Sequence, residues 1–170
     1  MVEAREHHNK LLISITNGEK LGEVGDLYLD AELTRVVAVQ AGSEGFINRQ
    51  ALAIARPHIQ VYGKDAWLVA GADTVVRIES IPGFESFVEA SSLRGREIHS
   101  EGGTRIGAIG DVILDGEARV LGFTLERVYV EGPLETRKTI SRTAISDVGG
   151  KDERMLTTLE QAESEIIELD

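Results

Sequence analysis

The sequence predicts a mainly β protein made of two tandem small antiparallel β-barrels, with a short helix possible at the C-terminus. Three observations lead to this fold class. Short apolar runs of strand length alternate with turn residues along the chain. A segment rich in glycine and aspartate occurs twice. Closing such short strands into barrels would also remove the exposed strand edges that they otherwise present.

The duplication defines the expected domains. Residues 18–30 read GEKLGEVGDLYLD and residues 103–115 read GTRIGAIGDVILD. Further on, VYGKD at 61–65 is matched by VGGKD at 148–152. Two matches in the same order and at nearly equal spacing indicate two copies of one unit. We therefore expect a first barrel over 8–79 and a second over 84–170, which includes an acidic C-terminal segment; each would bury its own core, and the two would pack together.

The strands of the first copy follow from its apolar pattern. Residues 11–15 form an apolar run that ends at an Asn-Gly turn. Residues 24–30 alternate as a half-buried strand does, and the β-branched residues 35–39 suit a strand buried on both faces. Residues 54–59 indicate a short strand followed by a turn, and 66–69 a further strand.

The second copy repeats this pattern. Residues 111–115 and 120–125 correspond to the central hairpin of the first copy. Residues 80–92 join the copies and contain an Ile-Pro-Gly turn, which predicts a structured connection instead of a flexible linker. Residues 157–170 have apolar residues at helical spacing, so a docked helix is the first choice, and a strand over 165–169 is the second.

Charge and composition restrict the classes of function. The chain has 18 Lys and Arg against 29 Asp and Glu, a net charge of −11. This disfavours direct nucleic-acid binding and docking on an anionic membrane. Without Cys there is no disulfide, iron–sulfur cluster, zinc–thiolate site or Cys nucleophile. No apolar run is long enough for a membrane span and the N-terminus has no signal-peptide pattern, so we expect a cytoplasmic protein without membrane insertion.

The repeated motif resembles the PRC-barrel family. The resemblance rests on residues 20–30 and 105–115, on the strand over 36–39, and on the closing Gly-Lys-Asp strand. The family includes the cytoplasmic domain of the photosynthetic reaction-centre H subunit and the C-terminal domain of a small-subunit ribosome-maturation factor. It implies a small, mostly antiparallel β-barrel that docks proteins and has no shared catalytic residues. This chain differs from both members, since it has neither the membrane helix of the first nor the separate N-terminal domain of the second.

The repeated aspartates form the sharpest polar pattern. Asp26 and Asp30 in the first copy correspond to Asp111 and Asp115 in the second. Carboxylates can bind a hard cation, but they also cap turns and backbone amides. Residues four apart on a straight strand are roughly 13 Å apart and cannot share one ion. We therefore favour turn and capping roles.

The remaining polar residues indicate no catalytic or metal site. The Gly22/Gly25 and Gly107/Gly110 pairs match no phosphate-loop motif and indicate bulges or barrel corners. No metal-ligand spacing joins the histidines, and a disordered end is expected around the first two. The histidines are His7, His8, His58 and His99.

Basic islands and two large aromatic residues are the remaining features of the sequence. The basic islands are expected to be solvated or ion-paired with neighbouring acids; they are Arg94, Arg96, Arg137 and Lys138. Trp67 and Phe46 could anchor a partner protein, although packing against the barrel is favoured for Trp67. The alignment of the copies places Arg154 opposite Trp67, which would make the two barrels differ on that surface.

Together these observations predict a non-enzymatic, cytoplasmic protein-interaction module. We assign no catalytic, cofactor-binding or metal-binding residue, no cofactor, and no specific partner-binding residue. The expected partner is an unidentified protein, without direct nucleic-acid contact, and a homodimer is possible. The alternatives are an accessory factor in ribosome maturation, an accessory factor of photosynthetic electron transfer, and an uncharacterised cation-binding protein or enzyme.

Overall fold

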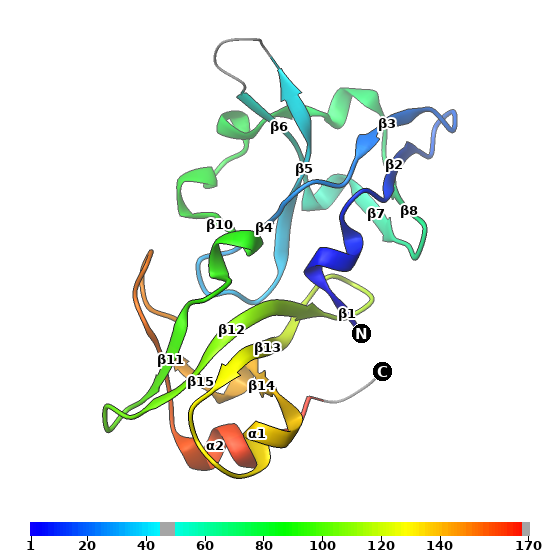
Figure 1. Ribbon diagram of the computed structural model, residues 1–170. Helices are drawn as coiled ribbons and strands as arrows, with labels where there is room; N and C mark the ends of the chain where they lie inside the picture. Colours follow the sequence, from blue (N-terminus) through cyan, green and yellow to red (C-terminus); the bar gives the residue numbers. More distant parts are fainter. Residues whose placement is uncertain (45–49, 168–170) are drawn as a thin grey trace.

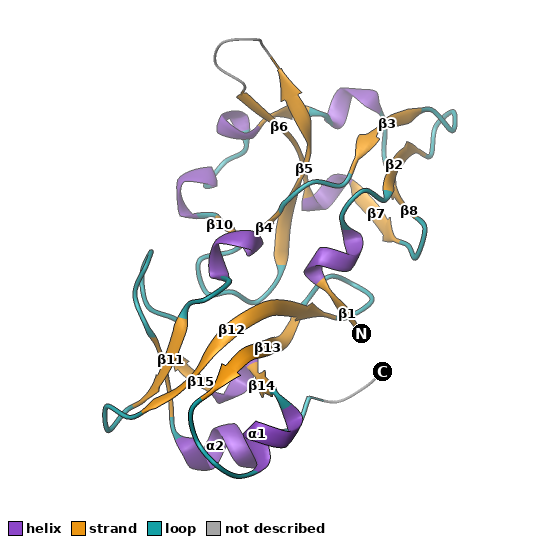
Figure 2. Cartoon of the chain, in the orientation of Figure 1, coloured by secondary structure: helices purple, strands orange, loops and turns teal. Residues whose placement is uncertain are grey.

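A computed structural model describes residues 1–44 and 50–167, and it is mainly β (Figures 1 and 2). We call residues 1–83 the first half and 84–167 the second half. The strands of the first half are β1 (Val2–Glu3), β2 (Leu11–Ser14), β3 (Lys20–Glu23), β4 (Leu27–Leu29), β5 (Val36–Glu44), β6 (Gln50–Ala55), β7 (Ile59–Tyr62), β8 (Ala66–Val69) and β9 (Val76–Arg77). Those of the second half are β10 (Val88–Glu89), β11 (Glu97–Ser100), β12 (Arg105–Leu114), β13 (Val120–Val128), β14 (Thr139–Ser141), β15 (Ile145–Asp147) and β16 (Met155–Thr157).

The helices are short and connect strands (Figure 2). The α-helices are α1 (Pro133–Arg137) and α2 (Leu159–Ser164). The 3₁₀ helices are η1 (Ala4–His7), η2 (Arg56–His58), η3 (Ala72–Thr74), η4 (Ile78–Ser80), η5 (Phe84–Ser86), η6 (Ala90–Leu93) and η7 (Arg142–Ala144). No helix of the described ranges combines the length and the apolar character needed to cross a membrane.

The two halves pair their strands in the same order. In the first half β2 pairs in parallel with β8 and antiparallel with β3, and in the second β11 does the same with β16 and β12. The β4–β5 and β5–β6 pairs correspond to the β12–β13 and β13–β14 pairs. The long strand β12 corresponds to β3 and β4 together. Because the first half is interrupted between β3 and β4, it forms two sheets, whereas the second half forms one.

The expected closed barrels are absent from the described part of the chain. The second-half path β14-β13-β12-β11-β16-β15 stays open between its end strands, which η7 joins. The first half has the paths β3-β2-β8-β7 and β4-β5-β6-β9, also open, and β10 from the second half extends the latter beside β4. One-turn helices carry the chain around these corners, and such turns form no strand ladder.

The core is continuous across both halves, so the expectation of separate cores was wrong. Fully buried Leu12 and Trp67 from the first half belong to the same apolar cluster as Ile98 and Phe123 from the second. A smaller cluster in the first half contains Tyr28, Ala38, Ala53 and Ile81. One shared core buries more apolar surface than two marginal cores of about eighty residues could bury alone.

Glycines in the repeated motif allow close approach between neighbouring strands. A Cβ on Gly22 would lie 2.6 Å from the carbonyl oxygen of Ala41, and one on Gly107 would lie 2.7 Å from that of Arg127. The register of β12 against β13 also shifts around Gly110, which marks a bulge. These glycines therefore serve strand crossing and bulging, as the sequence indicated.

The segment that connects the copies and the C-terminal segment are both structured. The connection over 80–92 contains η5, β10 and η6, so it is structured as predicted, and Phe87 packs near Tyr28 at a ring separation of 6.3 Å. At the C-terminus α2 forms, with Ala162 fully buried and the Thr158 hydroxyl accepting from the Gln161 amide. The helix was therefore the better prediction; residues 165–167 form no strand, and the rest of the alternative strand lies outside the described residues.

Candidate interaction site at the junction of the two halves

Each half supplies a short strand to the other. β1 pairs antiparallel with β12, with Val2 opposite Leu114, and β10 pairs antiparallel with β4, with Val88 opposite Leu29. β1 precedes the first half's sheets and β10 precedes those of the second. The exchange is reciprocal, as in an interface between two copies related by a two-fold axis.

Backbone hydrogen bonds continue this reciprocity at the two central hairpins. The Val36 amide donates to the Ala118 carbonyl at 2.9 Å, and the Val120 amide donates to the Thr34 carbonyl at 2.8 Å. Arg35 and Arg119 lie opposite each other in an isolated antiparallel bridge. The turns of the two hairpins therefore meet edge to edge.

Two arginines, one from each half, donate hydrogen bonds across the same junction. Arg56 Nη2 donates to the Glu117 carbonyl at 2.7 Å. Arg142 donates to the Glu32 carbonyl from Nε at 3.0 Å and from Nη2 at 2.7 Å. Because the guanidinium groups satisfy carbonyls in the opposite hairpin turn, both arginines hold the halves together.

The first aspartate of each motif accepts hydrogen bonds from a 3₁₀ helix near the start of the other half. Asp111 accepts from the Arg5 amide in η1 at 2.9 Å and from the Val112 amide at 2.8 Å. Asp26 accepts from the Ser91 amide in η6 at 3.2 Å, from the Ser91 hydroxyl, and from the Leu27 amide at 2.9 Å. Both carboxylates thus cap backbone amides across the junction.

The second aspartate of each motif closes a hairpin turn. Asp30 accepts from the Thr34 amide at 2.6 Å, and Asp115 accepts from the Arg119 amide at 2.9 Å and from its Nε at 2.8 Å. Burial acts to raise the pKa of Asp115, but the hydrogen bonds from Arg119 and Glu117 outweigh it and hold that pKa below its ordinary value. All four aspartates therefore have the capping roles favoured from the sequence.

A groove of about 470 Å³ lies at this junction. Its lining takes corresponding positions from both halves, including Ala4 with Ala90, Gly25 with Gly110, and Asp26 with Asp111. Arg5 and Arg94 bring positive charge to it, His8 adds an exposed imidazole, and Arg5 is paired with Glu3 at 2.5 Å. The groove thus combines small apolar groups, capped carboxylates and exposed cationic side chains.

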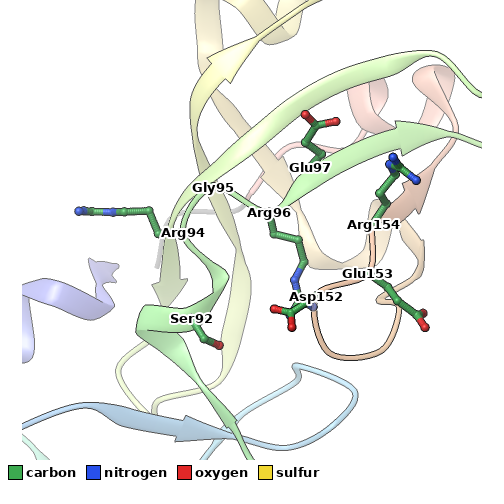
Figure 3. Close-up of a pocket in the computed structure, with 8 residues that line it drawn as sticks. All are labelled: Ser92, Arg94, Gly95, Arg96, Glu97, Asp152, Glu153 and Arg154. Atoms are coloured by element: carbon green, nitrogen blue, oxygen red, sulfur yellow. The ribbon is translucent and has the colours of Figure 1, made fainter.

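A second hollow, of about 620 Å³, opens on the other side of Arg94. Figure 3 shows the Arg94 side chain pointing away from this hollow and Arg96 extending toward the loop that carries Asp152. Its lining includes Arg94, Arg96, Glu97, Asp152, Glu153 and Arg154. The lining residues include three acids and three bases, so this basic island does not form a site of one charge sign.

A comparison with family models matches residues 85–151 to the PRC-barrel domain. This part of the chain is a PRC-barrel domain. The match contains the second copy of the motif, over 105–115, on which the resemblance rested. No curated protein matches the chain.

The junction also contains residues that sequence reasoning did not assign to it. Val2-Glu3-Ala4 and Val88-Glu89-Ala90 are identical triplets, and they form the two exchanged strands and the starts of η1 and η6. The second triplet lies in the PRC-barrel domain, and the first packs on that domain through β12. This repeat, at nearly the same spacing as the motif, was the signal that would have identified the exchange.

The expected disorder around His7 and His8 was wrong, because β1 anchors this end on the PRC-barrel domain. His7 is 3% exposed, and its Nδ1 accepts from Trp67 Nε1 at 3.1 Å and lies 3.1 Å from Lys10 Nζ. Burial and then the Lys10 charge lower the pKa of His7 to about 4. His8 lines the groove, whereas His58 is exposed in η2.

Within the PRC-barrel domain His99 Nε2 lies 2.7 Å from Glu97. The hydrogen bond with His99, aided by Arg105, lowers the pKa of Glu97. Across the described ranges the structure gathers no group of three or more His, Asp or Glu side chains that could hold a metal.

Arg137 donates to the Ala162 carbonyl at 2.7 Å and so caps α2. Lys138 ends α1 in the left-handed conformation.

Trp67 is fully buried and is not a surface anchor. Its neighbour in register on β2 is Leu12, and the equivalent pair in the second half is Ile98 with Met155. The structural counterpart of Trp67 is therefore Met155, and the alignment with Arg154 was one residue out because the connections differ in length. Phe46, the other suggested anchor, lies outside the described residues.

Proposed function

We propose that the chain is a cytoplasmic, non-catalytic tandem of two PRC-barrel-type units that docks another protein in the groove at the junction. The second half matches the family, and the first half repeats its strand order and its motif. On this proposal each unit is an open variant of the barrel, with 3₁₀ turns at the corners where a closed barrel would continue its ladder.

The observation that carries the proposal is the composition of the groove. Both halves line it with corresponding residues, so the groove is complete only when the two units are joined. Asp26 and Asp111 on its wall already accept backbone amides, which supports a structural role over general acid–base work. The groove therefore supports recognition better than catalysis.

The side chains indicate the kind of partner segment. Arg94 and His8 are exposed at the groove, and Ala4, Leu27 and Ala90 provide apolar surface between them and the core. A protein segment with a carboxylate opposite Arg94 and small apolar side chains opposite the alanines fits this surface. Direct contact with a nucleic-acid backbone is disfavoured by the net charge of −11.

Site-specific photo-crosslinking in the native cell tests this proposal. A photoreactive amino acid at His8, in the groove, should crosslink a defined protein, whereas the same amino acid at His58, also exposed but outside the groove, should not. Adding Arg94→Glu should weaken crosslinking from His8. No crosslinked protein, or the same proteins from both positions, would contradict the proposal.

A further inference from the structure

The outer face of the β3-β2-β8-β7 sheet is apolar. Along β2 and the residue that follows it, Leu12 and Ser14 are buried while Leu11 and Ile15 are 37% and 49% exposed, so the alternate residues point outward. On the neighbouring strands Val61 is 46% exposed, and Val61 lies opposite Leu68. The residues of this outer face are Leu11, Ile13, Ile15, Val61, Ala66 and Leu68.

The second half provides an internal comparison, because the same strands pair there in the same register. The positions equivalent to Leu11, Ile13 and Ile15 are Glu97, His99 and Glu101. The positions equivalent to Val61, Ala66 and Leu68 are Asp147, Arg154 and Leu156. One fold thus carries a charged outer face in one half and an apolar face in the other, so the strand geometry itself does not require apolar residues there.

We propose that this outer face is the contact surface of a symmetric dimer and that a second copy of the chain covers it. Two sheets pack face to face at about 10 Å, and a two-fold axis would set the apolar stripe of one copy on that of the other. An exposed apolar sheet face of this kind is typical of a contact surface.

Charge favours a second copy over a charged partner. Cross-strand pairing places Glu23 opposite Leu11 and Lys20 opposite Ile13, at the edge of the face. Lys20 Nζ and Glu23 Oε1 form an ion pair at 3.0 Å, so the two charges cancel. Each copy has a net charge of −11, so two copies would repel each other in most relative orientations. Contact through this neutral face places no like charges next to each other.

The first test is sedimentation of the full chain over a wide range of protein concentration. We expect a reversible monomer–dimer equilibrium, and the double variant Leu11→Glu, Ile15→Glu should weaken it about 100-fold, roughly tenfold for each substituted position. These substitutions copy the residues at the equivalent positions of the second half, Glu97 and Glu101, so they should not prevent folding. Val61→Asp, which copies Asp147, tests the face from a different strand.

The control is Ile166→Glu, which changes an apolar residue that is 68% exposed but lies off this face. It should leave the dimer unchanged. A chain that stays monomeric at every concentration would overturn the proposal. So would a dimer that resists both Leu11→Glu, Ile15→Glu and Val61→Asp, or one that Ile166→Glu weakens equally.

Crosslinking provides an independent measurement, since the chain has no Cys of its own. A flexible bismaleimide should join two copies of Leu68→Cys but not of Leu156→Cys, its counterpart on the charged face. Equal crosslinking of both variants would count against the proposal. The face shares no residue with the junction groove, so failure here and failure of the proposed docking function are separately visible.

Discussion

The buried His7–Trp67 pair predicts that the protein loses stability as the pH falls below neutral. Nδ1 of His7 accepts from Trp67 and lies beside the Lys10 ammonium. Protonating Nδ1 would break the bond from Trp67 and place a second positive charge next to Lys10. The folded state therefore holds His7 neutral, with a pKa of about 4 against an ordinary value of 6.5.

The sign and the size of the effect follow from these pKa values. The unfolded chain binds the proton below pH 6.5 while the folded protein does not, so stability falls as the pH drops from 6.5 toward 4. The full difference corresponds to about 3 kcal/mol, of which about 2 kcal/mol is lost by pH 5. Above pH 7 the contribution is fully present.

Denaturant unfolding at pH 7.5 and at pH 5 measures this loss, with the fluorescence of Trp67, the single tryptophan, as the probe. His7→Gln keeps an acceptor oxygen but cannot titrate, so it should remove most of the pH dependence. His58→Gln, at an exposed histidine, should retain it. Equal stability of the wild type at both pH values, or an unchanged loss in His7→Gln, would refute the reasoning.

Two further predictions concern stability. Arg142→Ala removes two hydrogen bonds to the Glu32 carbonyl across the junction and should lower the free energy of unfolding by about 1–3 kcal/mol in urea titrations; an unchanged midpoint would show that the junction does not depend on them. Gly122→Ala places a Cβ 2.2 Å from the Ile140 carbonyl oxygen and should lower the free energy of unfolding by at least about 2 kcal/mol. Gly116→Ala, which meets no atom within 4 Å, is its matched control and should change stability by less than about 0.5 kcal/mol; urea titrations of both variants measure the difference, and equal losses would contradict the contact argument.

Local pattern determined the strands because side-chain alternation and turn chemistry act over a few residues. The predicted run over 11–15 contains β2, and the run over 66–69 is β8. The hairpin turn closed by Asp30 lies at the turn residues that predicted it. The repeated motif also identified the family that residues 85–151 match. The capping roles of the aspartates followed from their places beside strands.

The tertiary structure decided which parts of the chain meet. Two residues, Val2 and Glu3, carry too little pattern to predict a strand, and they form one only because β12 offers an unpaired edge. That pairing then buries His7 against Trp67, sixty residues along the chain. The sequence by itself determined that β2 has an apolar residue at nearly every position, but not which side is covered. Long-range packing buries Leu12 and leaves Leu11 exposed, because alternation defines two faces and only the neighbouring elements choose between them.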